Sequence, residues 1–149
     1  MLKGIPKLLS PELLKVLCEM GHGDRIVIGD GNFPSESVGR NAAAVIRYDG
    51  QSIPSLLDAI LTVFPLDTYT DKPVLLMELM DRDKGIVDTP IWDEYRDVVA
   101  AHDARGADAV GTVERFAFYD EAKKCYAVIA TGETAIYANV ILQKGVVTD

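Results

Sequence analysis

Apolar residues recur along the chain at two spacings, one typical of amphipathic helices and one typical of buried strands. Near the N-terminus, Ser10 and Pro11 precede a helical stripe, and serine caps a helix well while proline suits its first turn. The stripe consists of Leu13, Leu14, Leu17 and Met20. Residues three and four positions apart share one helix face, so the pattern predicts an amphipathic helix that ends at Gly21.

Further along the chain, the same criteria predict strands that alternate with helices. Short apolar segments predict strands at residues 25–29, 43–48, 73–80, 126–130 and 140–143. Helical spacing predicts helices at residues 52–64, 91–104 and 115–124, and the polar residues 30–37, 67–72 and 81–90 are expected to be loops. We therefore expect an α/β fold, a three-layer sandwich with a largely parallel central sheet and helices on both faces. A chain of 149 residues can bury a sizeable core, and residues 1–149 are expected to form one domain.

Composition narrows the classes of function. The net charge of -8 disfavours nucleic-acid binding, which requires clustered lysine and arginine. No apolar segment reaches the roughly 20 residues that a membrane-spanning helix requires. Charged residues interrupt the N-terminal segment, so no signal peptide is expected, and Cys18 and Cys125 are predicted to be buried free thiols of a reducing compartment. We therefore expect a cytoplasmic protein without nucleic-acid or membrane partners.

The segment at residues 21–32 carries the clearest candidate chemistry. His22 lies between two glycines before a predicted strand, and Asp30 follows that strand. An imidazole and a carboxylate can exchange protons with a ligand, and the adjacent glycines let a small ligand approach the backbone. Structural roles fit these residues equally well, because His22 could cap the preceding helix and Asp30 could accept backbone N–H groups in a turn.

The predicted topology places these two residues at opposite ends of one strand. In parallel α/β sheets, ligands bind beyond the carboxyl ends of the strands, which is where Asp30 lies. His22 precedes the same strand and therefore falls at the other end. The two side chains can meet only if the loop doubles back or a neighbouring subunit supplies one of them. The topology thus suggests a site shared between subunits.

The sequence lacks the motifs of metal and nucleotide sites. It contains no Walker loop, Rossmann glycine fingerprint, His-Glu-x-x-His or Cys-x-x-Cys pair, and no nucleophile elbow. The chain has two histidines, of which His102 falls in a predicted amphipathic helix, so a zinc site is not expected. We predict neither a metal nor a cofactor. Among the remaining polar residues, Arg115 could simply pair with Glu114 or Asp120 on the surface.

Several further segments are distinctive, and they are Leu9-Ser-Pro-Glu-Leu-Leu-Lys-Val-Leu17, Glu19-Met-Gly-His-Gly-Asp24, Arg115-Phe-Ala-Phe-Tyr119, and Thr131-Gly-Glu133 followed by Tyr137-Ala-Asn139. These segments resemble a family of bacterial sugar mutarotases that contains L-fucose mutarotase and D-ribose pyranase. They occur in the family's order, and the resemblance extends over residues 9–145. The third segment begins with an arginine, and in this respect the chain is similar to the fucose branch of the family. The ribose branch tends to have histidine at that position.

The resemblance implies roles for particular residues. His22 would be the catalytic proton donor. The sugar-binding residues would be Asp30, Arg115, Tyr137, Ala138 and Asn139. We further expect Tyr137 to relay a proton or to bond the anomeric hydroxyl, and Asp30 to orient His22 or to bind a sugar hydroxyl. Asn32 stands where relatives carry a second histidine, and this departure leaves its role open.

The same resemblance implies an assembly and a reaction. The family forms ring-shaped homo-oligomers, commonly decamers of two stacked pentamers, with sites between adjacent subunits. We expect an isomerase that interconverts the α and β anomers of L-fucose, or of a similar monosaccharide, by acid/base-catalysed ring opening and closure, a task suited to histidine. The alternatives are D-ribose pyranase activity, which exchanges pyranose and furanose forms, and a non-catalytic monosaccharide-binding protein.

Overall fold

The computed structural model describes residues 1–148, in which helices and strands alternate along most of the chain. The α-helices are α1 (Pro11–Glu19), α2 (Ser35–Val38), α3 (Ile53–Leu61), α4 (Pro90–His102) and α5 (Arg115–Ala122), and two 3-10 turns are η1 (Gly39–Asn41) and η2 (Gly106–Ala109). The strands are β1 (Arg25–Gly29), β2 (Ala44–Tyr48), β3 (Val74–Met77), β4 (Val110–Val113), β5 (Ala127–Thr131) and β6 (Val140–Gln143).

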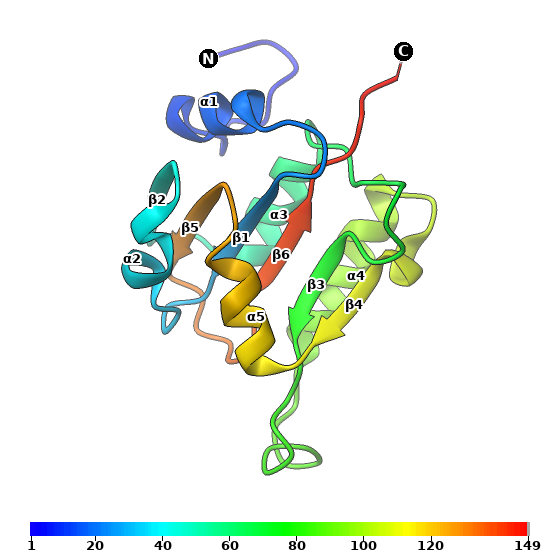
Figure 1. The fold of residues 1–149 in the computed structure, drawn as a ribbon. Coiled ribbons are helices and arrows are strands. Elements are labelled where there is room, and N and C mark those ends of the chain that lie inside the picture. The colour runs from blue at the N-terminus through cyan, green and yellow to red at the C-terminus, as the bar shows by residue number, and fades with distance from the viewer. Residues whose placement is uncertain (149) are drawn as a thin grey trace.

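These strands form one six-stranded sheet in the order β2-β5-β1-β6-β3-β4 (Figure 1). The pairs β2–β5, β5–β1 and β3–β4 are parallel, whereas β6 is antiparallel to both of its neighbours. The predicted largely parallel sheet is therefore confirmed, with one antiparallel strand inside it. β6 runs the other way because residues 132–139, which precede it, are too few for a parallel crossover, which takes about a dozen residues or more.

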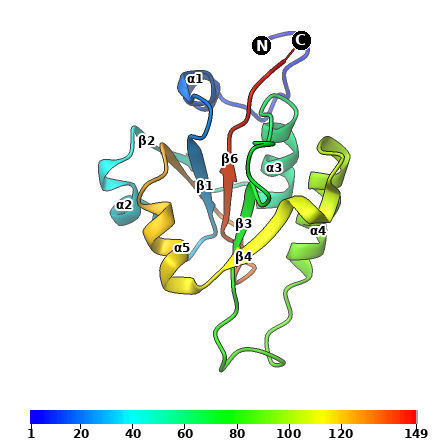
Figure 2. The same ribbon diagram turned by 45° about the vertical axis from the view of Figure 1, so that its right-hand side comes forward.

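Helices cover both faces of the sheet, which confirms the predicted three layers. Figure 2 shows α2 and α5 on one side of the strands and α3 and α4 on the other. Along β1, Ile26 and Ile28 join a core that contains residues of α1, α3 and α4, whereas Val27 joins a second core with residues of α2 and α5. These three side chains have 0% exposure. β1 is therefore a central strand buried on both faces, as parallel sheets require.

The first helix begins where the sequence predicts. The Ser10 hydroxyl accepts a hydrogen bond from the Leu13 N–H at 3.2 Å, which makes Ser10 the N-cap of α1. The Tyr48 hydroxyl, at the end of β2, accepts a bond from the Ser10 N–H at 2.8 Å and so fixes the helix start to the sheet. Cys18 lies exposed on α1, so the prediction that it is buried is wrong, whereas Cys125 is buried as predicted.

Two elements differ from the sequence-based expectation. Val110–Val113 forms β4 at the edge of the sheet, and the sequence did not predict it because Gly111 and Thr112 interrupt the apolar pattern. The polar segment at residues 30–37 was expected to be a loop, but α2 begins within it at Ser35. A helix of one turn is too short to produce helical periodicity in the sequence.

Gly132, directly after β5, lies against the backbone that follows β2. A Cβ atom at this position would lie 1.8 Å from the carbonyl oxygen of Asp49. Only glycine permits this approach, because a backbone carbonyl cannot rotate away as a side chain can. The contact directs the path of residues 132–139, which lead to the candidate site.

We expect Gly132→Ala to lower the free energy of unfolding by about 3 kcal/mol, since the clash with backbone forces the chain to shift. Gly50→Ala is the matched control, because a Cβ atom at Gly50 would meet nothing within 4 Å. That variant is expected to stay within about 0.5 kcal/mol of the parent. Urea unfolding measures both, and equal stabilities for the two variants would contradict the close approach at Gly132.

Candidate functional site

His22 and Asp30 lie at opposite ends of β1. The connection that contains His22 lies at the end of the sheet beside α1, and Asp30 follows the last residue of β1 at the other end (Figure 1). Strand β1 lies between them, and its five residues, which rise about 3.3 Å each, make it about 17 Å long. The loop does not double back, because the Gly23 N–H donates to the Lys144 carbonyl, after β6, at 2.8 Å. Within one chain the two residues are thus apart, as the predicted topology requires.

Around the imidazole, the structure assembles a group of side chains that we call the His22 cluster: His22, Asp67, Tyr69 and Gln143. His22 Nε2 lies 3.1 Å from Asp67 Oδ1. The centroids of the His22 and Tyr69 rings are 5.2 Å apart. The His22 side chain is 46% exposed whereas that of Asp67 is 3% exposed. A buried carboxylate therefore holds an imidazole that remains open to solvent.

Asp67 fixes the orientation of His22. Its carboxylate also accepts bonds from the Tyr69 N–H at 2.9 Å and from Gln143 Nε2 at 2.8 Å. Burial is the largest influence and raises the pKa of Asp67, but the hydrogen bonds from Tyr69, His22 and Gln143 together hold that pKa below its ordinary value. An ionised Asp67 binds the Nε2 side of the imidazole, which leaves Nδ1 able to exchange a proton with a ligand.

The helix-capping alternative for His22 is not realised. The carbonyls of Leu17 and Met20, at the end of α1, accept bonds from Lys144 Nζ at 2.7 Å and 2.5 Å. A lysine suits this position because the C-terminal end of a helix carries partial negative charge. His22 is therefore left to Asp67, and its exposed face remains available for a ligand.

Beyond the carboxyl ends of β1 and β3 lies a cavity of about 330 Å³, which we call the carboxyl-end pocket. Its polar lining includes Asp30, Arg82, Asp83, Arg115, Tyr137 and Asn139. The volume suits a small molecule, and the mixture of carboxylates, guanidinium groups and an amide suits a ligand rich in hydroxyls. A larger hollow of about 610 Å³ beside α1 is mainly aliphatic and contains none of the candidate residues.

Asp30 lines this pocket and is buried, with 5% exposure. Its N–H donates to Asn139 Oδ1 at 2.8 Å, and its carboxylate accepts from the Asn32 N–H at 3.0 Å. Burial raises the pKa of Asp30, and N–H donors such as those of Asn32 and Ala138 oppose that shift only in part. The carboxyl group forms the predicted turn, and a ligand hydroxyl would supply a further donor. Because Asn139 Oδ1 is occupied, its amide NH₂ is the part left for a ligand.

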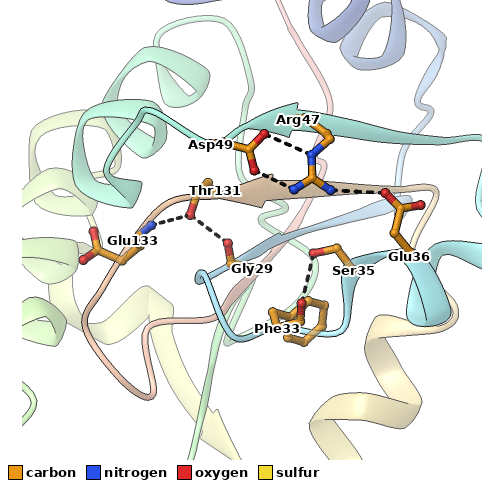
Figure 3. A network of polar contacts seen from close by, with 8 residues as sticks. All are labelled: Gly29, Phe33, Ser35, Glu36, Arg47, Asp49, Thr131 and Glu133. Carbon is orange, nitrogen blue, oxygen red and sulfur yellow. Dashed lines mark hydrogen bonds and ion pairs between the residues drawn. The ribbon is translucent and has the colours of Figure 1, made fainter.

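Polar contacts join the end of β5 to β1 and α3, as Figure 3 shows in part. The Thr131 hydroxyl donates to the Gly29 carbonyl at 2.8 Å and accepts from the Glu133 N–H at 3.2 Å. The Glu133 carboxylate accepts from the N–H of Ile53, the first residue of α3, at 3.2 Å. A carboxylate is stabilised at a helix N-terminus, so this bond ties the segment after β5 to the core.

Tyr137 has a φ of 57°, a left-handed conformation that is rare for residues other than glycine. Trp92 Nε1 holds its carbonyl at 2.8 Å, and the Tyr95 hydroxyl holds the carbonyl of Ala138 at 2.7 Å. The Tyr137 hydroxyl donates to Asp83 Oδ2 at 2.5 Å. Burial, and next the bond to Asp83, raise the pKa of Tyr137. The phenol is therefore protonated at neutral pH and directed by its neighbours.

Arg115 begins α5 and lines the carboxyl-end pocket. Nη1 lies 3.1 Å from Met80 Sδ, and the guanidinium carbon is 5.8 Å from the centroid of the Tyr119 ring. The predicted surface partners have other contacts. The Glu114 carboxylate caps α5 by accepting two backbone N–H groups, and Asp120 pairs with a lysine three residues later. The guanidinium group therefore keeps donors for a ligand.

The pocket thus brings together most of the residues singled out from the sequence. Asp30, Arg115, Tyr137 and Asn139 line it, together with Asn32. His22 lies at the other end of the sheet, and Ala138 is fully buried, with its carbonyl bound to Tyr95. Ala138 supports the site through its backbone, and its side chain packs in the core.

Sequence reasoning missed two carboxylates that contact the predicted proton-transfer residues. Asp67 binds His22, and Asp83 binds Tyr137. Both lie in polar segments expected to be loops, where no motif or periodicity marks a particular aspartate.

Within residues 1–148, no group of three or more histidine, cysteine, aspartate or glutamate side chains is placed to hold a metal ion. In the same residues, every helix is too short or too polar to cross a bilayer.

Comparison with known proteins gives a consistent result along the whole chain. A model of the RbsD / FucU transport protein family matches residues 3–147. Fucose mutarotase of Homo sapiens is 51% identical over 147 residues, which cover 97% of this chain and 94% of that protein. The crystal structure of FucU from Bifidobacterium longum is 64% identical with a TM-score of 0.94, and the match covers 98% of this chain and 100% of that one. The fucose mutarotase from Streptococcus pneumoniae, solved in complex with L-fucose, is 47% identical with a TM-score of 0.88 over 99% of this chain and 100% of that one.

We expect Asp67→Ala to lower the free energy of unfolding by about 2 kcal/mol at neutral pH, because the Tyr69 N–H and the Gln143 amide lose a charged acceptor. The folded pKa of Asp67 is lowered, so its contribution is present above the ordinary carboxyl pKa and disappears as the pH falls through the folded value. Urea unfolding of the parent and of Asp67→Ala measures the difference in their free energies of unfolding. That difference should be smaller at acid pH than at neutral pH.

The matched control is Asp58→Ala, which removes an exposed carboxylate that pairs with His102. Exposed pairs contribute about 0.5 kcal/mol, so this variant should resemble the parent. A stability difference for Asp67→Ala that persists unchanged in acid would contradict the assigned ionisation of Asp67.

Proposed function

The chain belongs to the RbsD/FucU family, and from this membership we propose that it is an isomerase, a mutarotase that interconverts the α and β anomers of L-fucose. The observation that carries the proposal is the carboxyl-end pocket. There Asp30, Arg115, Tyr137 and Asn139 converge, in a chain closely similar to a fucose mutarotase solved with L-fucose. The arrangement supplies several donors and acceptors for a compact polyhydroxylated ligand.

The reaction requires only proton transfers. Opening of the sugar ring needs a proton on the ring oxygen and the loss of the proton from the anomeric hydroxyl, and it produces a transient open-chain aldehyde. Closure onto the other face of the carbonyl gives the other anomer. A positioned acid or base contributes about 10²–10⁴-fold to such steps. Side chains of this chain can supply both groups.

The proposed roles follow from what each side chain has available. His22 delivers the proton to the ring oxygen from Nδ1, because Asp67 occupies its Nε2 side. Tyr137 bonds the anomeric hydroxyl. Asp30 accepts a bond from a sugar hydroxyl, and the donors for the remaining hydroxyls are the Arg115 guanidinium and the Asn139 amide. Asp30 and His22 lie at opposite ends of β1 within the chain, and we assign Asp30 to sugar binding because it lines the pocket.

We propose that the two halves of the site meet between neighbouring subunits of a ring-shaped homo-oligomer, a decamer of two stacked pentamers. The separation of His22 from the carboxyl-end pocket supports this assembly, since neither half contains both acid and base. Exposed apolar residues next to each half support it too, because subunit interfaces bury such groups. They are Tyr69 beside His22, and Phe116 and Ile136 beside the pocket. We also propose that the protein acts in the cytoplasm.

Replacement of His22 tests the reaction. We expect His22→Ala to lower the rate of L-fucose anomer exchange, measured by NMR exchange spectroscopy, by about 100-fold. His102→Ala is the matched control, because that histidine pairs with Asp58 on the surface and should leave the rate unchanged. Exchange in His22→Ala at the parental rate would remove His22 from the mechanism.

The same NMR measurement, made with D-ribose as well as with L-fucose, separates the other two candidate functions. Faster pyranose–furanose exchange of D-ribose, without acceleration of L-fucose, would assign the chain to D-ribose pyranase activity. Shifts of the sugar signals with no faster exchange of any sugar would indicate a non-catalytic binding protein.

A mixing experiment tests the shared site. His22→Ala and Tyr137→Phe each disable a different half, so each pure variant should be nearly inactive. Coexpressed in equal amounts, they should form mixed oligomers in which about a quarter of the sites combine two intact halves. The mixture should therefore have about a quarter of the parental activity. A mixture no more active than the pure variants would show that both halves act within one chain.

A further inference from the structure

Asp83 lies in the loop at residues 78–89, which connects β3 to α4 and contributes to the wall of the carboxyl-end pocket. Its Oδ2 accepts the hydroxyl proton of Tyr137 at 2.5 Å, and the Met80 N–H lies 3.4 Å from the same phenolic oxygen. Because the Tyr137 proton is directed at Asp83, the phenolic oxygen meets a ligand hydroxyl as an acceptor.

We infer that Asp83 is the terminal proton acceptor for the anomeric hydroxyl and acts through Tyr137. The inference rests on the proposed mutarotase function and identifies the base that the reaction requires. Asp83 is a positioning residue in this scheme, since Tyr137 touches the sugar and Asp83 touches Tyr137. His22 of the partner subunit supplies the complementary acid.

Ring opening moves one proton from the sugar toward Asp83 and one proton from His22 to the sugar. The anomeric O–H bond breaks and its proton moves to the Tyr137 oxygen, while the Tyr137 proton moves to Asp83 Oδ2. The electron pair of the broken O–H bond forms the carbonyl, and the pair of the bond between the anomeric carbon and the ring oxygen moves to that oxygen. The partner subunit's His22 donates a proton there. Closure runs the same transfers in reverse, so no net proton is consumed.

Tyr137 cannot act as the base alone. Burial and the bond to Asp83 raise the pKa of its phenol, so it carries its proton at neutral pH and can accept another only by passing its own on. The other charged or titratable groups that line the same pocket are Asp30, Arg82, Arg115 and Tyr119. Of these, Asp30 is the one other carboxylate in this lining, and its oxygens already accept backbone N–H groups such as that of Asn32.

The charges around Asp83 fit an acceptor that remains reachable. Arg82 Nε lies 3.6 Å from Asp83 Oδ1, but the Arg82 side chain is 77% exposed and holds the carboxylate weakly. The neighbouring Lys84 pairs with Glu78 and Asp81. Oδ2 of Asp83 is thus directed to Tyr137.

Asp83→Asn tests the inference, because asparagine keeps the size and the acceptor oxygen but cannot take the proton. We expect kcat for L-fucose anomer exchange to fall by about 100-fold with KM nearly unchanged. Asp81→Asn is the matched control in the same loop, since the Asp81 side chain is 96% exposed and pairs with Lys84. That variant should keep the parental kcat.

A double variant separates a relay from two independent effects. If Asp83 acts through Tyr137, then Asp83→Asn combined with Tyr137→Phe should lose no more activity than Tyr137→Phe alone. Asp83→Glu restores a carboxyl group and should recover part of the kcat that Asp83→Asn loses. If Asp83→Asn fails to fold, Asp83→Glu still tests the inference, because its kcat should lie between that of Tyr137→Phe and that of the parent.

Carbon NMR of labelled tyrosine rings measures the pKa of the Tyr137 phenol. A purely structural role of Asp83 in the loop would leave that pKa unchanged. The Tyr137 phenol should titrate at lower pH in Asp83→Asn than in the parent, because the neighbouring negative charge is gone. A parental kcat in Asp83→Asn, a change in KM only, or losses that multiply with Tyr137→Phe would each overturn the inference. If the parent protein accelerates no sugar, the proposed function itself fails, which is a different and recognisable result.

Discussion

Strand β1 is five residues long and buried on both faces, and its length separates His22 from the carboxyl-end pocket. His22 precedes it and Asp30 follows it, so a rigid element about 17 Å long stands between imidazole and pocket. Loop movement cannot close this gap, because the bond from the Gly23 N–H to Lys144 fixes one end and the bond from Asp30 to Asn139 fixes the other. This separation is the structural basis for the proposal that another copy of the chain completes the site.

Side chains that hold the backbone decide which groups remain free at the pocket. Asn139 uses its amide oxygen on Asp30, and Tyr95 occupies the carbonyl of Ala138. Trp92 in turn holds Tyr137 in a left-handed conformation. These bonds offset the strain of that conformation, which costs of order 1–3 kcal/mol. These bonds hold the segment between β5 and β6 in place, although it contains no helix or strand.

Much of this architecture was predictable from the sequence because it depends on local patterns. The cap at Ser10, the apolar strands and the amphipathic helices all leave periodic signals, and the resemblance to a known family pointed to Asp30, Arg115, Tyr137 and Asn139. β4 was missed because Gly111 and Thr112 break its pattern, and the antiparallel direction of β6 depends on a connection length rather than on residue type. Asp67 and Asp83 could not be found, since the pairing of one aspartate with a residue 45 or 54 positions away arises only when the loops meet in space.

The pairs formed by Asp67 and Asp83 have the same arrangement and lie at opposite ends of the sheet. In each, a side chain able to move a proton contacts a carboxylate that fixes its direction: Asp67 with His22, and Asp83 with Tyr137. The imidazole is half exposed above a buried carboxylate, whereas the phenol is more shielded and its pKa is raised. One end is therefore suited to give a proton and the other to pass one on. The proposed ring-opening reaction needs both functions on one sugar, and the proposed contact between subunits would bring the two ends together.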